Sequence, residues 1–306
     1  MKNSIFIFLL ITGIFISCQP TSQNKEEGYV PVNDKVRLTS FPYAAPDPVN
    51  GQVYGLVELG GSGFNSFIIE KDEADRWKMV KSNYGVSKVL ENELDEEAIK
   101  KGLAEYVDQM LAQGVKKDFV YFIQSSTASK DKKVQALDTI LREMGYNVVI
   151  VDVAQEAEYA FFSTMPKEFQ EEAFVVDIGS GNTKISWLEE GVVVSRDAPG
   201  SKYYQRELND SAVYNQVYDI VTSVPADKRK KCFMIGGVPF SLASENQEFA
   251  EQYTVLNEPT SYVTEDAKVF SGLNIYKAVS DAAPEAEGFI FDWYGNFTIG
   301  YLLQGL

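Results

Sequence analysis

The sequence predicts an α/β protein made of two similar halves. Each half begins with an apolar strand, an acid, a glycine turn and a second strand, first from Val57 to Ile69 and again from Phe174 to Trp187. Both halves then alternate stretches of helical periodicity with short apolar runs that are typical of buried strands. One unit found twice at domain-sized separation indicates a duplication, so we expect the two acid-led turns to face a common cleft.

The chain of 306 residues is long enough for two domains of roughly 100–150 residues each. We place an export signal at 1–18, a polar tether with several prolines at 19–50, one domain at 51–166 and the other at 167–306. A hydrophobic content of 45% and a charged content of 24% are ordinary for a protein with a buried core.

The first half is expected to open with strands at 53–59, 64–70 and about 77–84. A helix follows, with Asp95 as its N-cap, an apolar face between Ile99 and Leu111, and Gly114 at its end. We then expect a strand at 119–123, a helix at 132–144 closed by Gly145, a strand at 148–153 and a helix at 155–162.

The second half is expected to repeat this order with a different ending. Three strands are predicted at 174–178, 183–188 and 191–196, followed by a helix near 203–222 and a strand at 233–235. Helices are predicted from about 241 and over about 265–279, and strands at 289–292 and 297–303. Such an order mixes hairpins with right-handed crossovers, as α/β domains do.

The first 18 residues indicate export and lipidation. Lys2 precedes an apolar run from Ile5 to Ile16, which is shorter than the ~20 residues that span a bilayer and ends at Ser17-Cys18. This pattern resembles a bacterial lipoprotein signal with Cys18 as the lipidated residue; an ordinary cleaved signal or a membrane anchor is the alternative. We therefore expect a lipid-anchored protein of the bacterial cell envelope, in the periplasm or at the outer membrane.

Composition excludes several chemistries. The chain contains no histidine, so a Ser-His-Asp triad, a Cys-His pair and a histidine-ligated metal are impossible, and a general base must be Asp, Glu, Lys, Tyr or water. The net charge of −16 disfavours binding to nucleic acid or to an anionic membrane surface. The basic run at 228–231 is better explained as a solvated surface.

The two glycine turns are the candidate binding loops. Glycines let the backbone N–H groups of a tight turn approach a ligand, and an acid at the strand end can hold Mg²⁺. We assign Glu58 and Asp177 as candidate metal ligands. The candidate ligand-contacting residues are Gly60, Gly61, Ser62, Gly63, Gly179, Ser180, Gly181, Asn182 and Thr183, with Ser126 and Thr127 from the polar cluster after the strand at 119–123. The alternatives are a hairpin whose acid accepts turn N–H bonds, and a helix N-cap at 125–127.

These motifs and their order resemble the superfamily of acetate kinase, sugar kinases, Hsp70 and actin, whose members have two ribonuclease-H-like domains facing across a cleft. Within it, the chain is most similar to the exopolyphosphatase and guanosine-pentaphosphate phosphatase family, clearly so between about 53 and 190. Val57 to Ile69 looks like the family's first phosphate loop, Asp-aliphatic-Gly-Ser/Thr-Asn-Ser. Asp177 to Thr183 looks like the second, Asp-Ile-Gly-Gly-Gly-Ser-Thr-Glu.

Two further segments carry the resemblance. Residues 123–130 stand where the family has Ala-Thr-Ser/His-polar-aliphatic-Arg, and 151–159 where it has aliphatic-Ser-Gly-x-Glu-Glu-Ala-Arg. The second acid of the latter motif is the family's catalytic carboxylate and falls on Glu156, which would otherwise be a first-turn glutamate favoured by the helix dipole. The resemblance implies a Mg²⁺-dependent phosphoanhydride hydrolase that releases terminal phosphate from polyphosphate or a related phosphorylated ligand.

Several positions depart from the family's pattern. Glu58 replaces an aspartate, Gln155 the first acid of the Glu-Glu pair, Glu158 an arginine, and Lys184 the acid that closes the second loop. Losing a bidentate phosphate ligand and reversing a charge near the metal both weaken phosphate recognition. A second hypothesis is therefore a catalytically inactive envelope protein that acts as a phosphate-ligand sensor or a protein-interaction module.

An ATP-dependent kinase is a distant third hypothesis. Its specific support is Gly236-Gly237, which follows a strand and resembles the superfamily's adenosine-side turn, although a plain turn explains the pair better. Asp292-Trp293 is expected to be structural.

Overall fold

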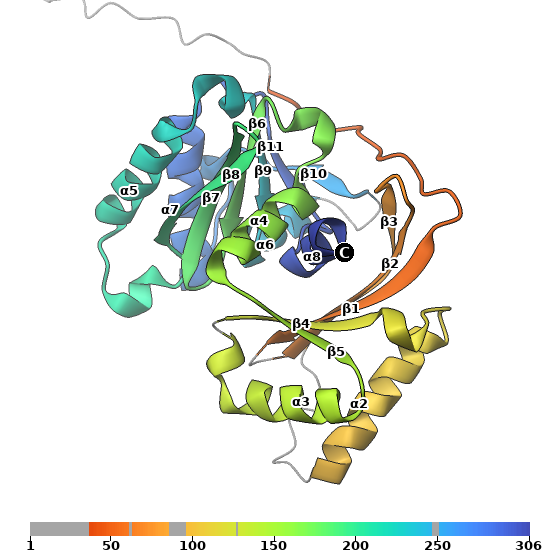
Figure 1. Cartoon of the computed structure of the whole chain (residues 1–306). Helices are drawn as coiled ribbons and strands as arrows, with labels where there is room; N and C mark the ends of the chain where they lie inside the picture. Colours follow the sequence, from red (N-terminus) through yellow and green to blue (C-terminus); the bar gives the residue numbers. More distant parts are fainter. Residues whose placement is uncertain (1–36, 61–62, 86–95, 127, 247–250) are drawn as a thin grey trace, which may run out of the picture. The chain divides into compact units, whose positions relative to one another are not determined.

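The structure is a computed structural model that describes residues 37–60, 63–85, 96–126, 128–246 and 251–306, all within one compact unit. It contains two β-sheets, each covered by helices (Figure 1). The predicted signal, Cys18, Asp95, Gly61, Ser62 and Thr127 lie outside the described residues. No helix in the described part of the chain is both long and apolar enough to cross a membrane.

The first sheet has five strands in the order β3-β2-β1-β4-β5. Strands β1 to β3 form an antiparallel meander, and β4 and β5 continue the sheet parallel to β1. The bounds are β1 Gln52–Gly60, β2 Gly63–Lys71, β3 Trp77–Gly85, β4 Val120–Ser125 and β5 Asn147–Val151. Helices α2 (Glu96–Leu111) and α3 (Lys132–Glu143) pack their apolar residues against one face of this sheet.

The second sheet repeats the first and adds one strand. Its order is β10-β11-β9-β6-β7-β8, in which β6, β7 and β8 form the antiparallel meander and β9 and β11 continue parallel to β6. The bounds are β6 Ala173–Ile178, β7 Asn182–Glu189, β8 Val192–Pro199, β9 Lys231–Ile235, β10 Tyr253–Val255 and β11 Phe289–Asp292. The shared order shows the duplicated unit that the sequence predicted.

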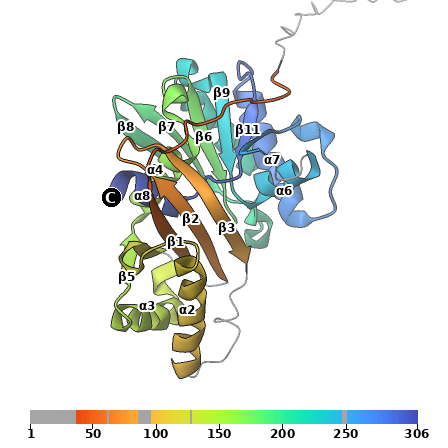
Figure 2. The same cartoon turned by 90° about the vertical axis from the view of Figure 1, so that its right-hand side faces the viewer.

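Helices α5 (Asp210–Ser223), α6 (Gly237–Asn246) and α7 (Ala267–Ala282) share one apolar core with a face of the second sheet. Helices α4 (Val153–Thr164) and α8 (Phe297–Gly305) cover the remaining faces (Figures 1 and 2). Phe161 of α4 packs with strand residues of the second sheet, and Ile299 and Leu302 of α8 pack with those of the first. Short 3₁₀ turns lie at Lys117–Phe119, Ala128–Lys130, Lys167–Phe169, Tyr203–Arg206, Ala226–Lys230 and Pro259–Ser261.

The two inner helices touch closely. A Cβ added to Gly300 of α8 would lie 1.9 Å from the carbonyl oxygen of Tyr159 in α4, so only glycine allows this approach. The contact joins a helix that covers the second sheet to one that covers the first.

The strand predicted at 297–303 is wrong, because this segment is α8. Phe297, Ile299, Tyr301 and Leu303 alternate as strand residues do, but a short apolar run also fits a buried helix. Asn296 decides the outcome, since its side-chain oxygen accepts from the Thr298 N–H at 2.8 Å and caps a helix. Elsewhere α6 begins at Gly237, earlier than expected, and a 3₁₀ turn at Tyr203–Arg206 precedes α5.

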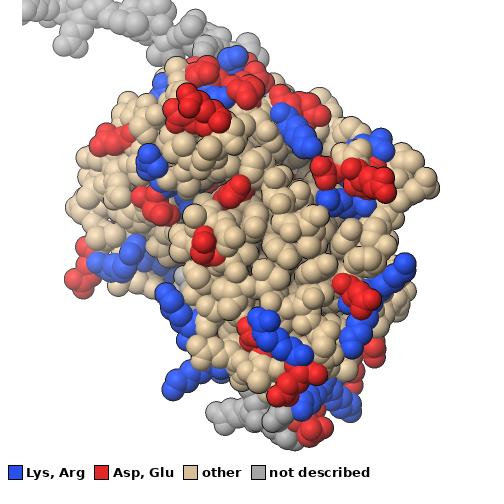
Figure 3. Space-filling view, in the orientation of Figure 1, with Lys and Arg blue, Asp and Glu red and all other residues tan. Residues whose placement is uncertain are grey.

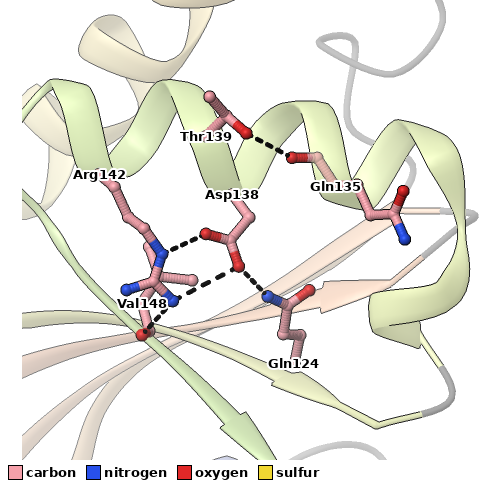
Figure 4. A network of polar contacts seen from close by, with 6 residues as sticks. All are labelled: Gln124, Gln135, Asp138, Thr139, Arg142 and Val148. Atoms are coloured by element: carbon pink, nitrogen blue, oxygen red, sulfur yellow. Dashed lines mark hydrogen bonds and ion pairs between the residues drawn. The ribbon is translucent and has the colours of Figure 1, made fainter.

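A polar network anchors α3 to the first sheet (Figure 4). Asp138 accepts hydrogen bonds from Arg142 Nε and from Gln124 Nε2, and Arg142 Nη2 donates to the Val148 carbonyl at 2.9 Å. Gln124 belongs to β4 and Val148 to β5, so the network fixes the helix over the strand that leads to Ser126.

Charges on the surface are mixed. Figure 3 shows acidic and basic side chains interspersed over the face in view. In the basic run, Lys228 pairs with Glu171 at 2.5 Å, Arg229 with Glu285 at 2.8 Å, and Lys231 with Glu172 at 2.7 Å. The side chains of Lys228, Arg229 and Lys231 are largely buried in these pairs, so the expected solvated surface is wrong for them, whereas Lys230 is exposed.

Candidate functional site

The parallel strands bring several acids to one place. In the second sheet β6, β9 and β11 run side by side in the same direction, so Asp177 and Asp292 lie at the same edge. In the first sheet Glu58 lies near the end of β1. Loops and side chains at the carboxyl ends of parallel strands are where α/β folds place their ligands. The topology therefore concentrates carboxylates at both strand edges.

One cavity of about 350 Å³ joins these groups. Its lining includes Glu58 from the first sheet, Asp177 and Asp292 from the second, and Glu156 from α4. The two predicted metal ligands and the predicted catalytic acid thus face a common opening. The predicted binding turn 179–181 does not line it, although the structure describes all three residues.

Glu58 links the two halves of the protein. Its Oε2 atom accepts hydrogen bonds from Asn65 Nδ2 at 2.9 Å and from Asn296 Nδ2 at 3.0 Å. Asn65 is its neighbour on β2, whereas Asn296 is the N-cap of α8. The carboxylate is therefore held in place from both sides.

A lysine lies between the other two predicted site acids. Lys184 is the cross-strand neighbour of Asp177, and its Nζ atom donates to Glu156 Oε1 at 2.8 Å. Its side chain is only 8% exposed. Burial lowers the pKa of Lys184, but the charges of Asp177 and Glu156 outweigh burial, so the pKa is raised and the side chain is an ammonium ion.

The surroundings of Asp177 shift the pKa of its carboxyl group strongly. Its pKa is raised to about 6, mainly by burial and to a smaller extent by the negative charges of Glu156 and Glu58, while Lys184 opposes the rise. Glu58, Glu156, Asp177 and Asp292 line this cavity, and Lys184 is bonded to Glu156.

Asp292 is the deepest of the four acids, with 1% of its surface exposed. Its Oδ1 atom accepts from the Tyr294 N–H at 2.9 Å, and burial raises its pKa to about 7. The aromatic rings of Trp293 and Phe240 lie beside it in the cavity wall, with centroids 5.4 Å apart. Asp292, which the sequence predicts to be structural, thus lies in the wall of this cavity.

Gly236 also lines the cavity, although the sequence predicts only a plain turn at Gly236-Gly237. Its φ is +103°, and a Cβ there would lie 2.4 Å from the Ile178 carbonyl oxygen and 3.0 Å from Asp177 Oδ1. Glycine therefore lets the backbone after β9 pack against the end of β6. Gly237 also lines the cavity and begins α6.

Hydrogen bonds from Ser201, Lys202 and Arg206 hold the second glycine turn in place. The Ser201 N–H donates to the Gly179 carbonyl at 2.9 Å, and Lys202 N–H to the Ser180 carbonyl at 3.0 Å. Arg206 Nη2 donates to the Gly181 carbonyl at 3.3 Å. The turn's carbonyls are thus bonded to protein, with Lys202 and Arg206 beside it.

The other predicted contact residues bond within the protein. Thr183 Oγ1 donates to the Pro199 carbonyl and Asn182 Nδ2 to Asp197 Oδ1, both at 3.0 Å. The Ser126 N–H donates to the Val151 carbonyl at 2.8 Å. Gly60 and Gly63 are paired at the end of the β1–β2 hairpin. The ligand roles of all these residues stay predictions.

The donor chemistry of the cavity fits Mg²⁺ only in part. Among the described residues, no three acids or cysteines lie close enough together to hold a metal ion. Mg²⁺, however, often uses one or two carboxylates and completes its coordination with water and substrate phosphates. Glu58 and Asp177 bring one carboxylate each from the two sheets to the same cavity, so the residues fit an ion that takes its other ligands from water and a phosphorylated molecule.

Known structures share this fold. A Ppx/GppA phosphatase from Aquifex aeolicus, in its type II variant, is 15% identical with a TM-score of 0.59, and the match covers 82% of this chain and 98% of that one. An exopolyphosphatase from Cytophaga hutchinsonii is 13% identical with a TM-score of 0.54, covering 83% of this chain and 99% of that one. The predicted actin-like ATPase fold of two ribonuclease-H-like units is confirmed. No protein-family model matches the sequence, and no curated protein is significantly similar to it.

Proposed function

We propose that the chain is a Mg²⁺-dependent phosphoanhydride hydrolase that releases terminal phosphate from a phosphorylated ligand. The observation that carries this proposal is the shared cavity, which collects Glu58, Asp177 and Glu156 from three elements. The fold, which is that of Ppx/GppA phosphatases, supports it. Phosphoryl transfer depends mainly on positioning and charge stabilisation, which such a cleft can supply.

Each acid has a distinct part in this proposal. Glu156 Oε1 accepts from Lys184, which fixes the carboxylate and leaves Oε2 to orient the attacking water or take its proton. Glu58, held by Asn65 and Asn296, and Asp177 would hold Mg²⁺, which supplies positive charge to the phosphoryl oxygens. Asn296 ties this arrangement to α8, so the two halves must be correctly placed for the site to form.

A non-hydrolysing phosphate-ligand sensor is the second candidate. It is favoured by the Lys184–Glu156 ion pair, because an ammonium bound to the acid competes with water for that carboxylate. In both cases we propose a lipid-anchored envelope protein, with the anchor on Cys18.

The deciding experiment is phosphate release by the purified chain lacking residues 1–24. Tripolyphosphate and ATP are incubated with Mg²⁺ or with EDTA, and wild type is compared with Asp177→Ala. We expect release that requires both Mg²⁺ and Asp177. Thermal stabilisation by these compounds without phosphate release would replace the hydrolase with the sensor, and the absence of both would remove both candidates.

A further inference from the structure

Residues 37–50 precede β1 and run from the second half of the protein to the first (Figures 1 and 2). We call this segment the strap; it contains neither helix nor strand. Its start is bound to the second half, where the Leu38 N–H donates to the Glu287 carbonyl at 2.6 Å. Arg37 Nε pairs with Glu258 at 2.9 Å.

The middle of the strap enters the core of the second half. Phe41 is only 8% exposed, and its ring lies edge to face with Phe233 and Tyr253, with centroids 5.6 and 5.4 Å apart. Tyr43 Oη donates to Glu168 Oε2 at 2.9 Å. Buried aromatic pairs of this kind hold a segment by both area and geometry, so Phe41 is the main anchor of the strap on the second half.

The end of the strap is bound to the first half. The Val49 N–H donates to Asp72 Oδ2 at 2.9 Å. Asp72 lies in the turn between β2 and β3, where it also accepts from Arg76 Nε at 2.7 Å and from the Ala74 N–H at 2.9 Å. The carboxylate is therefore fixed in the first half, and hydrogen bonds to a carboxylate are among the stronger ones in proteins.

The strap lies on the other side of the α4–α8 contact from the cavity. The two helices meet at Tyr159 and Gly300, and their first turns, with Glu156 and Asn296, face the cavity. A second pocket of about 170 Å³ lies at their carboxyl ends. The strap forms part of its wall, together with residues from both halves, among them Tyr43, Pro46, Trp77, Met165 and Leu303.

We propose that the strap limits pivoting of the two halves about the α4–α8 contact and so sets the width of the cavity. Halves joined by a small contact move relative to each other unless something holds them. A pivot at Gly300 would change the cavity and the second pocket in opposite senses. The strap spans the pocket side and is anchored in both halves, by Phe41 in one and by Val49 in the other.

Distances between spin labels test this in the chain lacking residues 1–24, which contains the whole compact unit at 35–306. The labels are placed at Lys132→Cys, where α3 begins after β4, and at Lys202→Cys, beside the second glycine turn. Both lysines are exposed, and Cys232 is fully buried and so does not take a label. The readout is the distribution of distances between the halves, measured without any ligand.

Two variants release opposite ends of the strap. Val49→Pro removes only the N–H that donates to Asp72, and Phe41→Ala removes the aromatic anchor. We expect both to add distances that the parent protein lacks, because losing a hydrogen bond to a carboxylate raises the population of a detached strap at least about tenfold. Ala45→Pro is the matched control, since it adds a proline to the strap where the N–H donates to no described residue.

An unchanged distribution in Val49→Pro, or in Phe41→Ala where circular dichroism shows it folded, overturns the proposal. The same new distances in Ala45→Pro also overturn it, because they would not arise from the loss of an anchor. If Phe41→Ala does not fold, the comparison of Val49→Pro with Ala45→Pro decides alone. Phosphate release has no part in this readout, so the strap can fail the test while the proposed function stands.

Discussion

Lys184 Nζ donates a hydrogen bond to Glu156 Oε1 over 2.8 Å and so ties β7 to the first turn of α4. The contact joins a lysine that stands where the family pattern has an acid to Glu156, the acid that we predict to be catalytic. Whether the pair holds a working base in place or blocks it is the question on which the proposed activity depends.

Glu156→Gln should separate turnover from binding. The amide keeps the shape of the side chain but cannot take a proton, so phosphate release should fall by about 10²–10⁴-fold while ligand affinity changes little. Steady-state phosphate release and calorimetric titration measure the two effects. Glu158→Gln, an exposed acid on the same helix, is the control and should leave the rate unchanged. A rate unaffected by Glu156→Gln would show that another group orients the water.

Lys184→Met should destabilise the fold because it leaves two acids without their counter-charge. Removing one partner of a buried ion pair costs about 3–5 kcal/mol, and the exposed fractions of 8% and 22% for the Lys184 and Glu156 side chains place this pair near that case. Urea unfolding at pH 8 gives the free energy of unfolding. The double variant Lys184→Met/Glu156→Gln should regain part of the loss, since one of the stranded charges is gone. Strictly additive losses would show that the pair is not coupled.

Asp292→Asn should stabilise the protein in a pH-dependent way. The native pKa of about 7 lies above the ordinary value of 3.8, so the native state binds more protons and its stability falls as pH rises between about 4 and 7. The full free-energy cost of keeping Asp292 ionised in the native state is present above about pH 7 and absent below about pH 4. At pH 8 the variant should therefore gain up to about 4 kcal/mol, at 1.36 kcal/mol per pKa unit. Urea unfolding at pH 4.5 and pH 8 tests this, and an equal effect at both values would contradict it.

Asn296 offers a test of the link between the two halves. Asn296→Asp keeps the cap on α8 but places a second carboxylate against Glu58 Oε2, where an amide N–H now donates at 3.0 Å. We expect a loss of about 1–3 kcal/mol in the free energy of unfolding, as for other buried groups that lose their donor. Adding Glu58→Gln should restore most of it, because the glutamine can donate to the new acid. If the second change brings no recovery, the loss arises elsewhere, for example at the cap.

The sequence identifies Asp177 as a candidate site residue but does not identify Asp292, and the difference lies in their neighbours along the chain. Asp177 closes an apolar strand and opens a glycine turn, so both its burial and its position follow from adjacent residues. Asp292 also closes an apolar strand, Phe289–Asp292, yet no glycine turn follows it, and its part in the cavity depends on β11 lying beside β9. The pattern of an acid ending a buried strand is the signal that could have identified it.

Contacts between the halves could not be predicted in this way. Asn296 reaches Glu58 only because 297–305 forms a helix, and this segment was predicted as a strand. Lys184 was noted for its reversed charge, but its bond to Glu156 depends on how α4 lies against the second sheet. Periodicity specifies which face of an element is buried, whereas such pairings are specified by the packing of elements distant in sequence.

Gly300 tests whether the contact between α4 and α8 holds the cavity together. In Gly300→Ala the new Cβ would lie 1.9 Å from the Tyr159 carbonyl oxygen and 2.4 Å from its carbonyl carbon, both rigid backbone atoms. The helices must separate, so we expect a loss of about 3 kcal/mol or more in the free energy of unfolding, at the upper end for overpacked cores.

Gly305→Ala is the matched control, because a Cβ there meets the Tyr301 ring of the same helix at 3.0 Å, and that ring lies near the end of the chain. Its unfolding free energy should stay within about 1 kcal/mol of wild type. Because Asn296 begins α8, displacement of the helix in Gly300→Ala should also weaken ligand binding under conditions where the protein is still folded. A Gly300→Ala variant as stable as Gly305→Ala would show that the close contact between α4 and α8 contributes little to the stability of the fold.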